Sequence, residues 1–133
     1  LLFFAGEATT VIYTLLIVGT VRWVEETETT SLWLNGALHG KPACVFSASG
    51  SMHGGQESTL LTMLPPLFHH GMMIMGLSNA QPALSYTKTG GTPYGASHVS
   101  GPRHDLTLRQ DEKILCEEQG KYLGQIVQKL QSL

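Results

Sequence analysis

A run of small, hydroxyl-bearing and glycine residues is the part of this chain best suited to chemistry. It separates an apolar stretch, residues 43–46, from a helix-like stretch that starts near residue 56. Glycine lets the backbone approach a ligand closely, and the first N–H groups of a helix have no intrahelical partner. These donors and the positive end of the helix dipole favour an anion or a row of carbonyl oxygens. We therefore predict a ligand-binding turn formed by Ser47, Ala48, Ser49, Gly50, Ser51, Met52, His53 and Gly54.

The side chains of this region do not predict a nucleophile or a metal site. Ser49 lacks the G-x-S-x-G context of a hydrolase. The adjacent His69 and His70 lie in the predicted helix, where the side chains of successive residues point in different directions and cannot bind the same metal ion. We find no cysteine or carboxylate at a metal-ligand spacing beside them. We expect no metal, and the chemistry of the turn should be that of a bound cofactor.

Composition excludes several classes of function. The 133 residues suit one globular domain, and a formal net charge of −2 provides no basic field for nucleic acid or anionic lipid. Cys44 and Cys116 both lie in apolar runs, which predicts buried thiols of a cytoplasmic protein instead of a disulfide framework. The apolar run Val11–Val18 is too short for a membrane-spanning helix. We interpret it as a buried parallel strand, with a membrane-associated or disordered segment as the alternatives.

Strands and helices alternate along the chain, which predicts an α/β sheet with ligands at the carboxyl ends of its strands. We expect strands at 10–20, 41–48 and 72–77, and helices at 56–70 and after a capping box at Thr107-x-x-Gln110. Residues 79–103 hold many Gly, Ser, Thr and Pro residues and should form a long loop. Pro65-Pro66 should kink or end the middle helix before His69. A kink would aim the histidine at the ligand, and the alternative is a shortened helix.

Several motifs in this order resemble those of the WrbA-type NAD(P)H:quinone oxidoreductases, a branch of the flavodoxin-like superfamily. The resemblance covers residues 32–133. The matching residues are Leu32-Trp33, Gly36-Ala37-Leu38-His39-Gly40-Lys41-Pro42, Val45-Phe46-Ser47, Gly50 to Glu57, His69-His70-Gly71-Met72 and Gly90-Gly91-Thr92-Pro93-Tyr94-Gly95-Ala96.

The resemblance implies a flavodoxin-like parallel sheet that binds FMN, takes electrons from NADH or NADPH and passes them to a quinone. It implies that the Ser47–Gly54 turn holds the flavin ring and that His69 contacts the flavin as the catalytic residue. Trp33 would line the quinone pocket. The alternatives are a capping or core role for His69 and plain packing for Trp33. Family members form homo-oligomers, dimers or tetramers, with sites near subunit boundaries.

The chain also departs from the family pattern. Residues 1–31 form a divergent segment with one expected strand, and residues 32–133 match the C-terminal part of a flavodoxin-like domain. No counterpart of the family's first strand and phosphate loop is present. We therefore expect a sheet incomplete at the N-terminus, with about three strands and flanking helices. An interaction module or an inactive fragment that does not hold FMN is the alternative to the enzyme.

Overall fold

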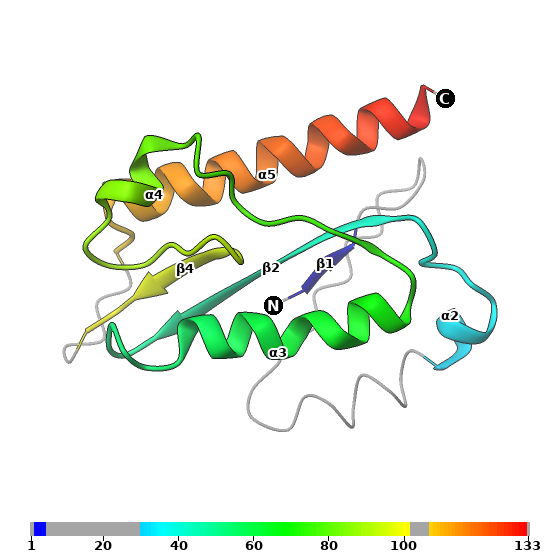
Figure 1. Cartoon of the computed structure of the whole chain (residues 1–133), viewed down its shortest axis with the longest axis horizontal. Helices are drawn as coiled ribbons and strands as arrows, with labels where there is room; N and C mark the ends of the chain where they lie inside the picture. The colour runs from blue at the N-terminus through cyan, green and yellow to red at the C-terminus, as the bar shows by residue number, and fades with distance from the viewer. Residues whose placement is uncertain (1, 5–29, 102–106, 133) are drawn as a thin grey trace.

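The computed structural model describes residues 2–4, 30–101 and 107–132, and the features reported below concern these residues. Two of the longest elements, α3 and α5, lie on opposite sides of the long strand β2 (Figure 1). The elements in chain order are β1 (Leu2–Phe4), α2 (Thr30–Leu34), β2 (Pro42–Ser49), α3 (Gln56–His69), β3 (Met73–Ile74), α4 (Pro82–Tyr86), β4 (Ala96–Val99) and α5 (Gln110–Gln131).

The sheet is organised around β2. β3 and β4 both pair with it in parallel, β3 opposite Pro42 and Ala43 and β4 opposite residues 46–49. The carbonyl of Ala43 accepts from Met75 N at 2.8 Å, and the carbonyl of Ser49 accepts from Ser100 N at 2.9 Å. Successive carbonyls of a strand point to opposite edges, so these two carbonyls share one edge. β3 and β4 are therefore two segments of one interrupted edge strand.

A side chain of α5 bridges the point where this edge strand is interrupted. The Gln119 side chain donates from Nε2 to the carbonyl of Val45 at 2.9 Å and accepts from Ala96 N at 2.7 Å through Oε1. The amide thus satisfies a carbonyl of β2 and the first N–H of β4 where strand pairing passes from β3 to β4. Gln119 is buried, and water does not reach these two backbone groups. Its side chain supplies the hydrogen bonds that they would otherwise lack.

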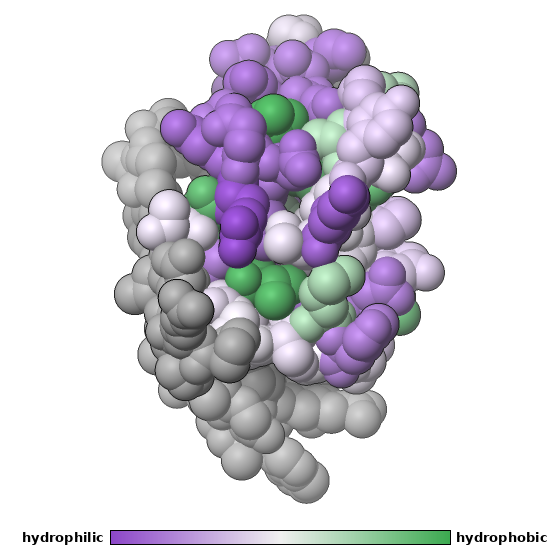
Figure 2. Space-filling model, turned by 90° about the vertical axis from the view of Figure 1, so that its left-hand side faces the viewer, coloured by the Kyte–Doolittle hydropathy of each residue, from purple (hydrophilic) through white to green (hydrophobic). Residues whose placement is uncertain are grey.

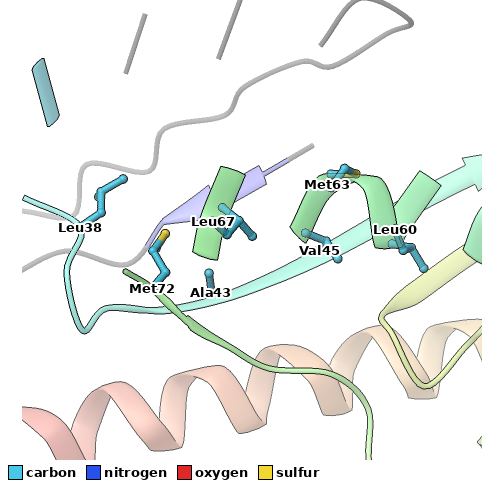
Figure 3. Packing of buried hydrophobic residues seen from close by; sticks show 7 residues of the cluster. All are labelled: Leu38, Ala43, Val45, Leu60, Met63, Leu67 and Met72. Atoms are coloured by element: carbon cyan, nitrogen blue, oxygen red, sulfur yellow. The ribbon is translucent and has the colours of Figure 1, made fainter. Parts of the chain in front are cut away.

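The two faces of β2 carry separate parts of the core. Ala43 and Val45 pack with apolar side chains of α3, and Figure 3 shows this cluster closely. The residues of the cluster are Leu38, Ala43, Val45, Leu60, Met63, Leu67 and Met72. On the other face, Phe46 packs with Leu115 of α5 and with Ala96 of β4. This alternation of side chains along β2 is what a strand covered by helices on both faces requires.

The predicted fold class is confirmed, because three parallel strands with helices on both faces form an α/β sheet. The antiparallel pairing of β1 with residues 43–45 of β2 was not predicted. The predicted strand at Val11–Val18 lies outside the described residues. Within these residues, no helix has both the length and the apolarity needed to cross a membrane.

The prediction that Pro65-Pro66 ends the middle helix early was wrong. α3 continues through both prolines to His69. Proline removes an N–H donor, so these two residues leave the carbonyls of Leu61 and Thr62 without helical partners. Leu61 and Thr62 are exposed, and water can satisfy their carbonyls. Beyond the prolines, the buried Leu67 keeps the helix packed on the sheet.

Four smaller predictions also need correction. The loop predicted at residues 79–103 contains α4 and β4, and the strand predicted at 72–77 is reduced to β3. The capping box at Thr107 does not form, because α5 begins at Gln110 and its N-cap is Arg109. Cys44 is buried as expected, whereas Cys116 is exposed. The apolar pattern around Cys116 belongs to a helix with only one face on the core.

Truncation of a fully buried leucine on α3 should destabilise the fold. Leu60 has 0% exposure and Leu61 has 43%. Leu60→Ala removes buried apolar contacts and leaves a cavity, so we expect a loss of about 2–5 kcal/mol in the free energy of unfolding. Leu61→Ala, the neighbouring control, should change it by less than about 1 kcal/mol. Urea denaturation followed by circular dichroism measures both values, and equal losses would contradict the placement of this helix face.

Candidate functional site

The segment between β2 and α3 forms a tight, exposed turn at the carboxyl end of β2. Ser49 Oγ donates to the carbonyl of Ser51 at 2.7 Å, and Gly54 N donates to the same carbonyl at 3.0 Å. A Cβ atom on Gly54 would lie only 3.0 Å from Ser49 Cβ, so a side chain there would fit only if its neighbours in the turn shifted slightly. Ser47 Oγ is buried and has no hydrogen-bond partner among the described residues.

The start of α3 presents backbone donors beside this turn. Gly55 occupies the N-cap position with φ of 84°, a left-handed conformation that glycine adopts without steric cost. Because glycine has no side chain, it cannot cap the helix, and no side chain of the described chain replaces it. The first helical bond runs from Thr59 N to the carbonyl of Gly55 at 2.8 Å. The N–H groups of residues 56–58 precede that bond and have no helical acceptor.

A cleft of ≈ 550 Å³ opens beside the turn. One wall comes from the turn and the start of α3, and the other comes from the loop before β4 and from β4 itself. Figure 2 views the molecule from the end where β2 and β4 terminate, and hydrophilic side chains predominate on the described surface there. The cleft is lined by Met52, His53, Gly55, Gln56, Glu57, Ser58, Thr89, Gly91, Thr92 and Ser97.

The loop wall of the cleft is packed closely against α5 and β4. A side chain on Gly90 would collide with the carbonyl of Ser97, and one on Gly91 would collide with Leu115. Gly91 also has φ of 107°, which L side chains rarely adopt. Its N–H donates to Ser97 Oγ at 2.8 Å. Both glycines are therefore required by the close approach of the loop to its neighbours.

A buried carboxylate holds this loop from behind. Glu112, with 0% exposure, accepts hydrogen bonds from the backbone N–H groups of Gly90 at 2.9 Å, Val99 at 3.0 Å and Arg109 at 2.9 Å. His98 Nδ1 lies 2.8 Å from Oε2 of the same carboxylate. Burial alone would raise the pKa of Glu112, but the hydrogen bonds to its charged form outweigh burial and lower the pKa to about 2.

The predicted site residues divide between the two ends of α3. Met52 and His53 of the predicted turn line the cleft at its N-terminal end. Trp33 and His69 lie together at the other end, with ring centroids 4.9 Å apart. α3 places His69 thirteen residues after Gln56, which is about 20 Å along a helix. One chain therefore does not bring Trp33 and His69 to the turn.

The sequence analysis missed the second wall of the cleft and the carboxylate behind it. Gly90, Gly91 and Thr92 were recognised as part of a family motif but were not assigned to the site. Nothing in the sequence pattern distinguishes Glu112 from Glu117 on the same helix, because only the fold shows which of them is buried. No group of three or more metal-ligating side chains gathers anywhere in the part of the chain that is described.

Comparison with known proteins identifies clear relatives. No family model matches the chain. It is 43% identical over 104 residues to a protein named NAD(P)H dehydrogenase (quinone) from Geotalea daltonii, a match that covers 77% of this chain and 51% of that protein. A protein of the same name from Syntrophobacter fumaroxidans is 42% identical over the same shares, and one from Methanosarcina barkeri is 43% identical over 101 residues, 74% of this chain and 49% of that protein. The chain spans about half the length of these curated relatives. The matches confirm the family resemblance found in the sequence.

The low pKa of Glu112 predicts a loss of stability in acid. A carboxyl group with a pKa of about 2 when folded and an ordinary pKa when unfolded stabilises the fold above about pH 4.5, by about 3 kcal/mol. This contribution falls as the pH drops from about 4.5 towards the folded pKa of about 2, and about 2 kcal/mol of it is lost by pH 3. Glu112→Gln should therefore destabilise the fold strongly at pH 6 and much less at pH 3.

Denaturation with urea at the two pH values measures this difference. Glu117→Gln, a change of an exposed carboxylate on the same helix, is the control and should keep the acid dependence of the native chain. If the free energy of unfolding of Glu112→Gln differs from that of the native chain by the same amount at pH 6 and at pH 3, the assigned role of the buried carboxylate is contradicted.

Proposed function

We propose that this chain, a homologue of proteins named NAD(P)H dehydrogenase (quinone), binds FMN at the turn after β2 and reduces a quinone with electrons from NADH or NADPH. The observation that supports the proposal most is the cleft that opens beside the turn predicted from the sequence. When bound, FMN would supply the redox chemistry of the reaction. The protein would bind and orient the ring and keep water from it.

The chemistry of the turn fits the uncharged ring of a flavin. The ring carries carbonyl and N–H groups along one edge, and the backbone N–H groups of residues 56–58, which have no helical acceptor, can donate to the carbonyls. The described residues that line the cleft include no Lys or Arg side chain, so this part of the lining suits the ring better than a phosphate group.

We further propose that His69 and Trp33 act on the flavin site of a second copy of the chain. The two side chains lie together but about 20 Å along α3 from the turn of their own chain. Trp33 is 44% exposed, and neighbouring Phe68 is 60% exposed, so an aromatic surface is available for contact. In a homodimer or tetramer, Trp33 would stack against the quinone and His69 would contact the flavin.

That no basic side chain lines the cleft among the described residues also supports a second candidate function. Phosphate groups in proteins are held by charge-assisted hydrogen bonds, each worth about 1.5–3 kcal/mol. A chain without such contacts would hold FMN weakly and could instead serve as a flavodoxin-like interaction module, or be an inactive fragment. We place either function in the cytoplasm, where free cysteines such as Cys44 and Cys116 stay reduced.

Titration with FMN separates the two functions. We expect saturable quenching of flavin fluorescence by the native chain, with a dissociation constant in the micromolar range or below. Gly54→Val strains the turn, because a Cβ there lies 3.0 Å from Ser49 Cβ and from the Ser51 carbonyl oxygen, and both must shift to make room. It should weaken binding by at least about tenfold. Gly120→Val on α5, where a side chain meets open space, should leave binding unchanged. A folded native chain that shows no saturable binding would refute the flavin proposal.

Mixing two inactive variants tests the contribution of a second copy. His69→Ala removes the proposed catalytic side chain, and Gly54→Val removes the turn. A dimer that combines one chain of each kind has one site with an intact turn and an intact histidine. Random pairing of equal amounts should then restore about a quarter of the native rate of quinone reduction. Mixtures no more active than the separate variants would show that the two residues do not complete one site from different chains.

A further inference from the structure

The loop wall of the cleft is connected to α5 through one charged side chain. Thr89, Gly91 and Thr92 line the cleft, and Gly90 stands between them without lining it. The N–H of Gly90 instead donates to Glu112 Oε1 at 2.9 Å. The same oxygen accepts from Val99 N at the end of β4, so the carboxylate joins the loop to the strand that follows it.

We propose that Glu112 is a positioning residue for the cleft, whose carboxylate holds the Thr89–Thr92 wall at the spacing from the turn that a ligand requires. Other contacts shape the loop itself. Thr87 Oγ1 donates to the carbonyl of Gly90 at 2.6 Å, for example. Such bonds fix the form of the loop but do not fix its distance from α5. Glu112 links the loop, β4 and the start of α5 at one point.

The geometry requires a carboxylate at this position. An ionised carboxylate accepts hydrogen bonds at both oxygens and donates none. Glu112 receives bonds from three backbone N–H groups and lies within hydrogen-bond distance of His98 Nδ1. A glutamine would place an NH₂ group against at least one of these donors. An alanine would leave all of them without an acceptor in a buried place, which is costly.

Gln119 provides a matched control on the same helix. It is buried like Glu112, and it also holds backbone groups through its side chain. Its bonds go to Val45 and Ala96, which do not line the cleft. Gln119→Ala should therefore destabilise the fold as Glu112→Ala does, without releasing the loop wall.

Amide hydrogen exchange measured by NMR tests the role of Glu112 without any ligand. In the native chain, the N–H groups of Gly90 and Val99 should be protected. In Glu112→Ala, exchange at Gly90 and Gly91 should accelerate at least about 100-fold relative to the amides of β2, because the wall opens locally. In Gln119→Ala, exchange at Gly90 and Gly91 should follow that of β2. Glu112→Gln replaces the alanine variant if the latter does not fold.

The inference would be overturned if Gly90 and Gly91 exchange in step with β2 in the Glu112 variant, or if Gly90 is unprotected in the native chain. An unprotected Gly90 in the native chain would overturn the inference even if neither Glu112 variant folds. A second readout rests on the proposed function: FMN affinity should fall at least about tenfold in Glu112→Ala and stay within about threefold in Gln119→Ala. If the native chain does not bind FMN, the proposed function fails, and hydrogen exchange alone decides the role of Glu112.

Discussion

The pairing of one edge of β2 with two separate strand segments is the constraint on which the rest of the structure depends. β3 uses the first part of this edge and β4 uses the second, so the chain between them must leave the sheet and return to it. That excursion forms α4 and the loop wall of the cleft. The interruption would leave backbone groups unsatisfied, and the Gln119 amide satisfies two of them. A helix packed across the break thus both closes the sheet and carries the residue that supports the cleft.

Hydrophobic pattern and glycine content were sufficient to predict the long elements. The continuous apolar run before Ser47 predicted β2, because a strand buried on both faces is apolar at successive positions. The leucine spacing predicted α3, because a helix buried on one face repeats apolar residues every three or four positions. The turn between them followed from its glycines. The interrupted edge strand could not be predicted, because the four residues of β4, between Gly95 and Ser100, are too few to show a hydrophobic period. The extent of α3 past its prolines depends on the burial of Leu67, which is a tertiary contact.

The site shows the same division between local and tertiary information. Residues 47–54 are continuous in sequence, and their chemistry could be interpreted directly. The opposite wall comes from residues about 40 positions later. It is held by Glu112, which lies 22 positions after Gly90. The resemblance alone assigned Trp33 and His69 to the quinone and flavin sites, and the structure places their ring centroids 4.9 Å apart. Their distance from the turn is a property of helix length, which a list of motif residues does not convey.

The antiparallel strand β1 has a consequence for the behaviour of the chain at high concentration. Leu2–Phe4 pairs with residues 43–45 on the edge of β2 that β3 and β4 do not use. A bare strand edge offers a row of N–H and C=O groups to any other extended segment, and recruitment of such segments is how intermolecular sheets grow. By occupying part of this edge, Leu2–Phe4 prevent an extended segment of another molecule from pairing with residues 43–45.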